Sequence, residues 1–284
     1  MQAQSGKLAR LMPEASLLDR LIRRLDLRQG GTDCFIGGAG AGGVTADDRL
    51  FGGLVVAQAA VASARTVGDF LMHSMHAYFL RPGRPDADIE CRVRRIKEGR
   101  NFRVRSVEAW QNEHLILQLQ ASFCRAELGV RHQRPMPSTP APGDLPNRDA
   151  LRGRTNWRSM PLDLRMASEI TAGRPLEPNQ DIWLRPNGPL PDDPLVHLGL
   201  LLYASDRTLL ETAWRPHCDH GELAGASLDH SLWLHRLPRL DDWHLYTMES
   251  PAAEAGRGLV HGAIYDAEGN RVCSVAQEGV LRVR

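Results

Sequence analysis

The amino-acid sequence predicts an α+β protein, from its bulk composition and from the order of its periodic segments. An apolar fraction of 42% and a charged fraction of 24% over 284 residues are typical of a folded chain with one large or two ordinary domains. In each half, an apolar helical segment precedes a run of strand-like segments that alternate apolar and polar residues. This order, a helix followed by successive antiparallel strands, is expected of an α+β fold.

The first half begins with an amphipathic segment, residues 14–28, whose leucines recur at helical spacing after Ser16, a candidate N-cap. Residues 52–67 are apolar on nearly every face, which indicates a buried helix. Four alternating segments separated by turns then predict antiparallel strands, at 73–82, 86–96, 101–110 and 114–123.

Residues 126–150 contain five prolines and little periodicity, which is typical of a linker. The second half then repeats the order of the first. Asp193 and Pro194 are a suitable N-cap and first residue for a helix that we expect to reach about Leu210. Strand-like segments follow at 227–236, 243–250, 257–266 and 270–283. The predicted organisation is an N-terminal unit at 10–125, a Pro-rich linker at 126–160 and a C-terminal unit at 161–284.

The two halves align in one gap-free register, which predicts a duplicated unit. In this register His73-Ser74 falls on His230-Ser231, and Gln120 falls on Gln277. Ser227, however, falls on a phenylalanine, Phe70. A functional site that needs a hydroxyl is therefore expected only in the second half, with Gln120 in a structural role.

Charge and cysteine content exclude several classes of protein. The 35 basic and 34 acidic side chains are interspersed and give a net charge of +1, so no broad field recruits nucleic acid or anionic lipid. The five cysteines are odd in number and form no C-x-x-C pair, which favours a reducing compartment. The N-terminus has no signal-like apolar region, and no segment has eighteen consecutive apolar residues. We expect a cytoplasmic protein with no nucleic-acid or membrane partner.

Two motifs that would indicate other enzymes are weak or absent. Gly38, Gly40 and Gly43 fit G-x-G-x-x-G, but no convincing strand precedes them and no helix opens from them, so a loop is the better interpretation than a nucleotide site. The sequence contains no G-x-S-x-G elbow, which argues against a serine α/β-hydrolase.

The histidines do not predict a metal site. His73 and His76 lie three apart in a strand and therefore point to opposite faces. His217, Cys218 and His220 fall within one short loop that offers no fourth ligand. We expect neither a metal nor a cofactor, and we assign His230 and His235 to support of the fold.

Eight strings carry a family resemblance: FGGLVVAQA (51–59), HSMHAYFLRPG (73–83), GRNFRVRSVEAWQNE (99–113), ASF (121–123), YASD (203–206), SLDHSLWLHR (227–236), RGLVHG (257–262) and VAQEGVLR (275–282). In this order and spacing they resemble the acyl-CoA thioesterase II family over roughly residues 10–284. The resemblance implies a double hotdog fold, in which two tandem units each wrap a curved antiparallel sheet around a long central helix.

The family's hydrolytic residues are an Asp on the second central helix, a Thr or Ser, and a Gln on a later strand. By motif these positions correspond to Asp206 in YASD, Ser227 in SLDHS and Gln277 in VAQEG. Two residues depart from the pattern. Ser227 stands where relatives often have Thr, and Leu54 stands where they often have Gln.

These residue types suit thioester hydrolysis. Asp206 can accept a proton from water at neutral pH, which makes it the candidate general base, while Ser227 and Gln277 can orient that water by hydrogen bonding. Gln277 also shares a strand face with apolar residues, and a buried polar group needs partners. Backbone N–H groups at the Gly52-Gly53 start of the first buried helix are the candidate contacts for the substrate oxyanion.

The resemblance therefore implies an enzyme of lipid metabolism that hydrolyses fatty acyl-CoA to free fatty acid and CoA. Two alternatives stay open: a hotdog enoyl-CoA hydratase or dehydratase, for which the expected Asp and His segment is missing, and a non-catalytic acyl-CoA-binding protein. Exposed edge strands are compatible with further assembly into homodimers or tetramers.

Overall fold

The computed structural model describes residues 15–40, 49–156, 158, 160–170, 173–217 and 223–283. Its largest element is one antiparallel sheet of thirteen strands in the order β1-β2-β4-β5-β6-β3-β10-β13-β12-β11-β8-β7, with β9 paired to β13 off this path. The strands are β1 (Arg28–Gly31), β2 (Cys34–Gly37), β3 (Leu71–Phe79), β4 (Ile89–Glu98), β5 (Phe102–Gln111), β6 (His114–Cys124), β7 (Leu162–Met166), β8 (Asn179–Pro186), β9 (Leu223–Ser227), β10 (Asp229–Leu234), β11 (His244–Glu254), β12 (Arg257–Tyr265) and β13 (Arg271–Val283).

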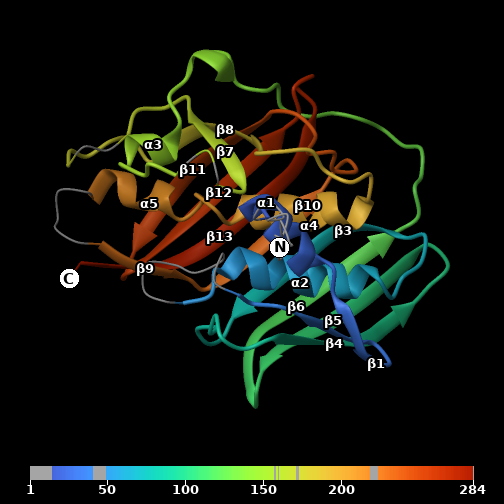
Figure 1. Cartoon of the computed structure of the whole chain (residues 1–284). Helices are drawn as coiled ribbons and strands as arrows, with labels where there is room; N and C mark the ends of the chain where they lie inside the picture. Colours follow the sequence, from blue (N-terminus) through green and yellow to red (C-terminus); the bar gives the residue numbers. More distant parts are fainter. Residues whose placement is uncertain are drawn as a thin grey trace, which may run out of the picture.

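Three helices pack together against the sheet: α1 (Leu17–Leu25), α2 (Gly52–Ala64) and α4 (Pro194–Ser205). Figure 1 shows α2 and α4 beside each other on one face of the sheet, with α1 close to both. Helices α2 and α4 run antiparallel: Gly53 at the start of α2 approaches Asp206 after the end of α4, while Val61 near the end of α2 approaches Gly199 in the middle of α4. The other helices within the described residues are short: η2 (Pro142–Asp144), α3 (Arg148–Leu151), α5 (Glu211–Trp214) and η4 (Arg215–His217). None of the helices in the described part of the chain could cross a membrane.

Local sequence explains where the helices begin. Ser16 accepts a hydrogen bond from the Asp19 amide while the Asp19 carboxylate accepts one from the Ser16 amide, so the predicted N-cap is confirmed. Asp193 likewise accepts from the Leu195 amide, with Pro194 at the first helical position. The α2 segment is apolar all round and lies in the core, buried from Gly53 to Ser63.

The predicted end of the second buried helix is wrong. Helix α4 ends at Ser205, and the Asp206 amide bonds to the Ala204 carbonyl, which interrupts the helical pattern. The apolar pattern extends beyond the end of the helix because Leu209, which lies in a turn, is also buried in the core. The helix therefore presents Asp206 at its very end.

The strand predictions for the first half are confirmed within a few residues, and those for the second half need one change. Residues 227–236 are two strands, since β9 ends at Ser227 and β10 begins at Asp229. Sequence reasoning also missed the pairs β1 with β2 and β7 with β8, which lie in stretches rich in glycine or proline. The two halves meet where β3 pairs with β10, and there the sheet is continuous.

The gap-free alignment of the halves is wrong in the last strand of each. Gln120 is exposed on β6, whereas Gln277 is buried on β13, so they face opposite sides of the sheet. Strand pairing gives the true correspondence: Ser74 pairs with Ser122, and Ser231 pairs with Ala276. The residue that follows is Phe123 in the first half and Gln277 in the second. A core phenylalanine thus stands where the second half has its buried amide.

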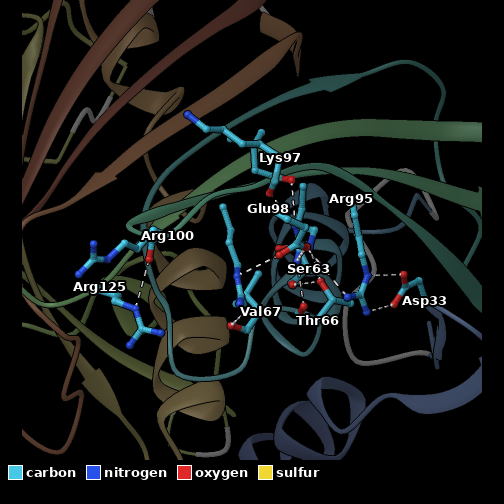
Figure 2. Close-up of polar contacts among 12 residues, drawn as sticks. Asp33, Ser63, Thr66, Val67, Arg95, Lys97, Glu98, Arg100 and Arg125 are labelled. Carbon is cyan, nitrogen blue, oxygen red and sulfur yellow. Dashed lines mark hydrogen bonds and ion pairs between the residues drawn. The ribbon is translucent and has the colours of Figure 1, made fainter.

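A buried arginine joins the C-terminal end of α2 to the sheet. Arg105 on β5 is fully buried, and its guanidinium donates to the Thr66 hydroxyl over 2.7 Å and to the Thr66 carbonyl over 2.9 Å. It also donates to the Lys97 carbonyl and forms an ion pair with Glu98. Figure 2 shows the contacts around Thr66, Lys97 and Glu98. Thr66 directly follows the C-cap residue Arg65, so the guanidinium lies next to the C-terminal end of α2, where the helix dipole favours a cation.

We expect Arg105→Ala to lower the free energy of unfolding by about 2–5 kcal/mol, because it leaves a cavity and removes the partners of several polar groups. Arg95, which is half exposed and pairs with Asp33 at 2.8 Å, is the matched control, since an exposed ion pair contributes about 0–1 kcal/mol. Urea unfolding of the two variants measures the difference. An equal decrease in the free energy of unfolding for Arg105→Ala and Arg95→Ala would contradict the prediction that the buried arginine contributes more than the exposed ion pair.

Candidate functional site

The candidate site lies where the end of α4 meets the start of α2. The two backbones approach so closely that a Cβ atom on Gly53 would lie 3.0 Å from the Asp206 Cβ. On Gly52 it would lie 3.2 Å from Asp206 Oδ2. Glycine at both positions therefore lets the start of α2 approach the carboxylate.

Asp206 is a buried carboxylate with few but strong partners. Its side chain is only 4% exposed. Gln277 Nε2 donates a hydrogen bond to its Oδ1 over 2.6 Å, and the Gly53 backbone amide donates a second bond to the carboxylate. Burial raises the pKa of Asp206 from 3.8 to about 6, although Gln277, Gly53 and the nearby Arg207 cation oppose the rise. The carboxylate is thus mostly ionised at neutral pH and protonates in weak acid.

Gln277 is held in turn by a chain of buried polar groups. Its Nε2 lies 3.2 Å from His230 Nδ1, and His230 Nε2 lies 2.9 Å from Ser205 Oγ. Ser205 donates to the Leu202 carbonyl over 2.9 Å. Burial lowers the pKa of His230 to about 3, so this imidazole is neutral.

A cavity of about 620 Å³ opens beside the carboxylate. Asp206 and Ser227 line the same cavity, together with Gly52. Its apolar walls come from both halves of the chain and include Phe51, Val55, Phe79, Ile116, Tyr203 and Leu228. Charged side chains line it as well: Arg49, Arg81, Arg154, Arg207 and Glu211. A cavity that combines apolar walls with polar and charged groups is typical of a small-molecule site.

Strand pairing places Ser227 close to the Gln277 segment. Ser227, the last residue of β9, pairs with Gly279, two residues after Gln277 on β13. The structure thus joins Asp206 to Gln277 directly and puts Ser227 on the wall that Asp206 also lines. The catalytic roles of these three residues stay a prediction.

The two glycines differ in what they contact. Gly52 lines the cavity. The Gly53 amide instead bonds to Asp206. The first residue of α2 therefore lines the cavity, and the second residue binds the Asp206 carboxylate.

Sequence reasoning assigned His230 to support of the fold and did not place it next to Gln277, which it contacts. His230 and Leu232 are both completely buried and share one face of β10. The criterion that singled out Gln277, a polar residue on an apolar strand face, would also have found His230. His235, by contrast, is exposed and bonds to Ser274 Oγ over 2.7 Å.

The alternation expected for His73 and His76 is interrupted, because the register of β3 against β6 shifts between Met72 and Ser74. His73 Nε2 bonds to Ser122 Oγ, and His76 Nδ1 bonds to Ser231 Oγ, on different strands. In the described part of the chain, no three His, Cys, Asp or Glu side chains group as metal ligands would. Gly43, Cys218 and His220, which the other two motifs require, lie outside the described residues.

Comparison with known proteins gives the class of fold and the family. The family description "Acyl-CoA thioesterase N-terminal domain" matches residues 41–124, and "Acyl-CoA thioesterase" matches 154–280. A hotdog-fold protein of Alicyclobacillus acidocaldarius superposes with a TM-score of 0.79 at 17% identity, covering 93% of this chain and 98% of that one. The large antiparallel sheet with few helices is thus of the hotdog class.

Relatives of higher identity define the family. Acyl-coenzyme A thioesterase 8 of Mus musculus is 37% identical, with 85% of this chain and 82% of the relative aligned. Acyl-CoA thioesterase 2 of Haemophilus influenzae is 36% identical, with 82% and 88% aligned. The structure of an acyl-CoA thioesterase II from Mycobacterium marinum superposes with a TM-score of 0.80 at 37% identity, covering 93% of this chain and 98% of that one. This chain belongs to the acyl-CoA thioesterase family, as its motifs predict.

The raised pKa of Asp206 predicts that the ionised carboxylate lowers the free energy of unfolding of the protein. An ionised Asp206 is disfavoured in the folded state, so the penalty is absent below pH 3.8, grows between 3.8 and about 6, and is constant above. A shift of this size corresponds to roughly 3 kcal/mol as an upper limit. We expect Asp206→Asn to raise the melting temperature at pH 7–8.

Thermal unfolding across the pH range measures this effect. The stability gain of Asp206→Asn over the wild type should shrink below pH 6 and vanish near pH 3.8, as the wild-type carboxylate becomes protonated. A gain that is the same at pH 4 and pH 8 would contradict the burial penalty.

Proposed function

We propose that this protein hydrolyses fatty acyl-CoA to free fatty acid and CoA, with Asp206 as the general base. The observation that carries the proposal is a buried carboxylate of pKa about 6 on the wall of a cavity that has both apolar and charged lining residues. A base of this pKa is ionised at neutral pH yet more basic than an ordinary aspartate. The apolar walls suit an acyl chain, and membership of the acyl-CoA thioesterase family supports the same substrate class.

Each residue then has a defined role in the reaction. Asp206 accepts a proton from a water molecule as the water oxygen attacks the thioester carbonyl carbon. The resulting tetrahedral species collapses, the carbon–sulfur bond breaks, and the CoA thiolate leaves and takes up a proton. The net change consumes one water and yields a carboxylic acid and a thiol.

Gln277 and Ser227 orient the water in this scheme. Because Gln277 Nε2 faces the carboxylate, its Oε1 is the free end of the amide, and that oxygen is buried with no hydrogen-bond partner. It can accept a hydrogen bond from the attacking water, which would satisfy an otherwise costly buried group. The Ser227 hydroxyl on the cavity wall supplies the third polar contact.

The first two residues of α2 have different roles in the proposed reaction, one toward the base and one toward the substrate. The Gly53 amide holds Asp206, so we assign the approach of the thioester carbonyl to Gly52, which lines the cavity. The positive end of the α2 dipole favours negative charge there, both on the carboxylate and on the developing oxyanion.

The proposed architecture is a double hotdog, with one unit at 10–125 around α2, a linker at 126–160, and a second unit at 161–284 around α4. At the corresponding described positions, the first unit does not repeat the residues of the site. The residue after its helix is Arg65, where α4 is followed by Asp206, and Phe123 stands where the second unit has Gln277. One site per chain follows. Assembly into dimers or tetramers and a cytoplasmic location remain predictions.

Release of free thiol from palmitoyl-CoA distinguishes this function from its rivals, because neither hydration of an enoyl-CoA nor simple binding releases thiol. We expect the wild type to release thiol and Asp206→Asn to lower kcat by at least about 10²-fold, as loss of a general base does. Asp229→Asn is the matched control, since Asp229 is a nearby half-buried carboxylate that accepts from the Glu278 amide and does not line the cavity. An unchanged rate in Asp206→Asn would remove Asp206 from the mechanism.

The pH dependence of kcat/KM tests the ionisation of the base. Only the ionised carboxylate accepts a proton, so kcat/KM should fall about tenfold per pH unit below about 6. An ordinary solvated aspartate would place this acid limb near 4. Initial rates from pH 4 to 8 decide between the two, and a limb near 4 would mean that Asp206 is not the titrating base.

A further inference from the structure

We infer that His230 is a positioning residue that holds the Gln277 amide against the Asp206 carboxylate through its neutral Nδ1 atom. The inference rests on the proposed function, because it concerns the orientation of the same base. Neither His230 nor Gln277 is among the residues that line the cavity, and His230 Nδ1 lies 3.9 Å from Asp206 Oδ1, beyond hydrogen-bond distance. It can therefore act on Asp206 only through Gln277.

The hydrogen-bond directions along the chain follow from the chemistry of its two ends. Ionised Asp206 only accepts, so the atom that lies 2.6 Å from its Oδ1 must be the amide nitrogen of Gln277. The other hydrogen of that nitrogen is directed to His230 Nδ1, 3.2 Å away, which must then carry a lone pair. The opposite orientation of the amide would bring its oxygen against the carboxylate oxygen.

The remaining proton of the imidazole is also accounted for. With Nδ1 as the acceptor, Nε2 carries the hydrogen and donates to Ser205 Oγ, and Ser205 donates to the Leu202 carbonyl. The two imidazole nitrogens and the Ser205 hydroxyl hydrogen thus each have a defined hydrogen bond. Only the tautomer of His230 that is protonated at Nε2 fits these bonds. A protonated imidazole would turn Nδ1 into a donor facing another donor, and complete burial keeps that form away.

These contacts close a ring around the end of α4. Ser205 and Asp206 are consecutive residues: the first is bound to His230, and the second to Gln277. The Tyr246 hydroxyl donates to the Ser205 carbonyl over 2.8 Å and anchors the same turn to β11. β10 and β13 are paired strands, with Ser231 opposite Ala276, so His230 and Gln277 are held by the sheet. The ring therefore connects the base to a rigid backbone.

Two amide variants separate the two nitrogen positions of the imidazole. The short side chain in His230→Asn can place an oxygen near the former Nδ1, which retains an acceptor for Gln277. The longer one in His230→Gln reaches toward Ser205 but leaves no acceptor next to Gln277. We expect His230→Gln to lower kcat on palmitoyl-CoA by about 10²-fold with little change in KM, since misplacement of a catalytic group by about 1 Å can have that effect. His230→Asn should retain most of kcat.

The pH profile gives a readout that a purely structural role would not change. The Gln277 hydrogen bond lowers the pKa of Asp206, so its loss in His230→Gln should move the acid limb of kcat/KM upward from about 6, while His230→Asn leaves it in place. His235→Gln is the control, because His235 also bonds to a serine of β13 but is exposed. Urea unfolding allows rates to be compared per folded molecule.

The outcomes are distinct. Equal loss of kcat in both His230 variants with an unmoved acid limb would show that His230 only supports the fold and would overturn the inference, as would full activity in His230→Gln. Absence of thiol release by the wild-type protein would instead refute the proposed function.

Discussion

The candidate site depends on one contact, the insertion of the Asp206 carboxylate between the end of α4 and the start of α2. Removal of a charge from water is costly unless hydrogen bonds replace its hydration. Gln277, the Gly53 amide and the Arg207 charge supply part of that replacement. The raised pKa shows that they do not supply all of it. Close contact between the helices requires glycine at 52 and 53, and the end of α4 at Ser205 sets the position of the carboxylate.

The long strand β13 carries Gln277 and so connects the Asp206 contact to the rest of the sheet. It pairs with β12 along one edge and with β10 and then β9 along the other. Gln277 lies where the partner changes from β10 to β9, so His230 comes from one neighbouring strand and Ser227 from the other. Leu228 crosses between them and bonds to the Glu278 carbonyl. The break after Ser227 is thus what allows one strand to bring three polar side chains near the end of one helix.

Much of the fold could be predicted from residue patterns, because burial imposes periodicity. The α2 segment is apolar all round since it is surrounded by sheet and helices, and strands with one buried face alternate. The predictions failed where local pattern does not encode the answer. The register between Gln120 and Gln277 depends on pairing between distant strands, and a shift of an odd number of residues exchanges the faces. β7 and β8 lie in stretches that contain prolines, and their pairing is not predicted by any local signal.

The site itself was predictable only in part. Motif resemblance assigned Asp206, Ser227 and Gln277, but no spacing rule could bring residues so far apart in sequence into contact. Alternation marked Gln277 as a buried polar group, yet His230 carries the same mark and was assigned to the fold. The histidine contacts the amide but does not line the cavity, so only three-dimensional contacts separate a supporting role from a positioning one.

The degree of burial at Asp206 reflects a balance between basicity and ionisation. Complete compensation by more donors would return the pKa toward 3.8 and leave a weaker base, whereas deeper burial without donors would raise it above neutrality and leave the base protonated. A pKa of about 6 lies between these limits. Gln277 is suited to this balance, because a neutral amide donates one hydrogen bond to the carboxylate without adding a charge. A cation in its place would stabilise the ionised form more strongly and reduce its basicity. The neutrality of His230 behind Gln277 follows from the same requirement, since a second buried charge so close to the base would shift its pKa again.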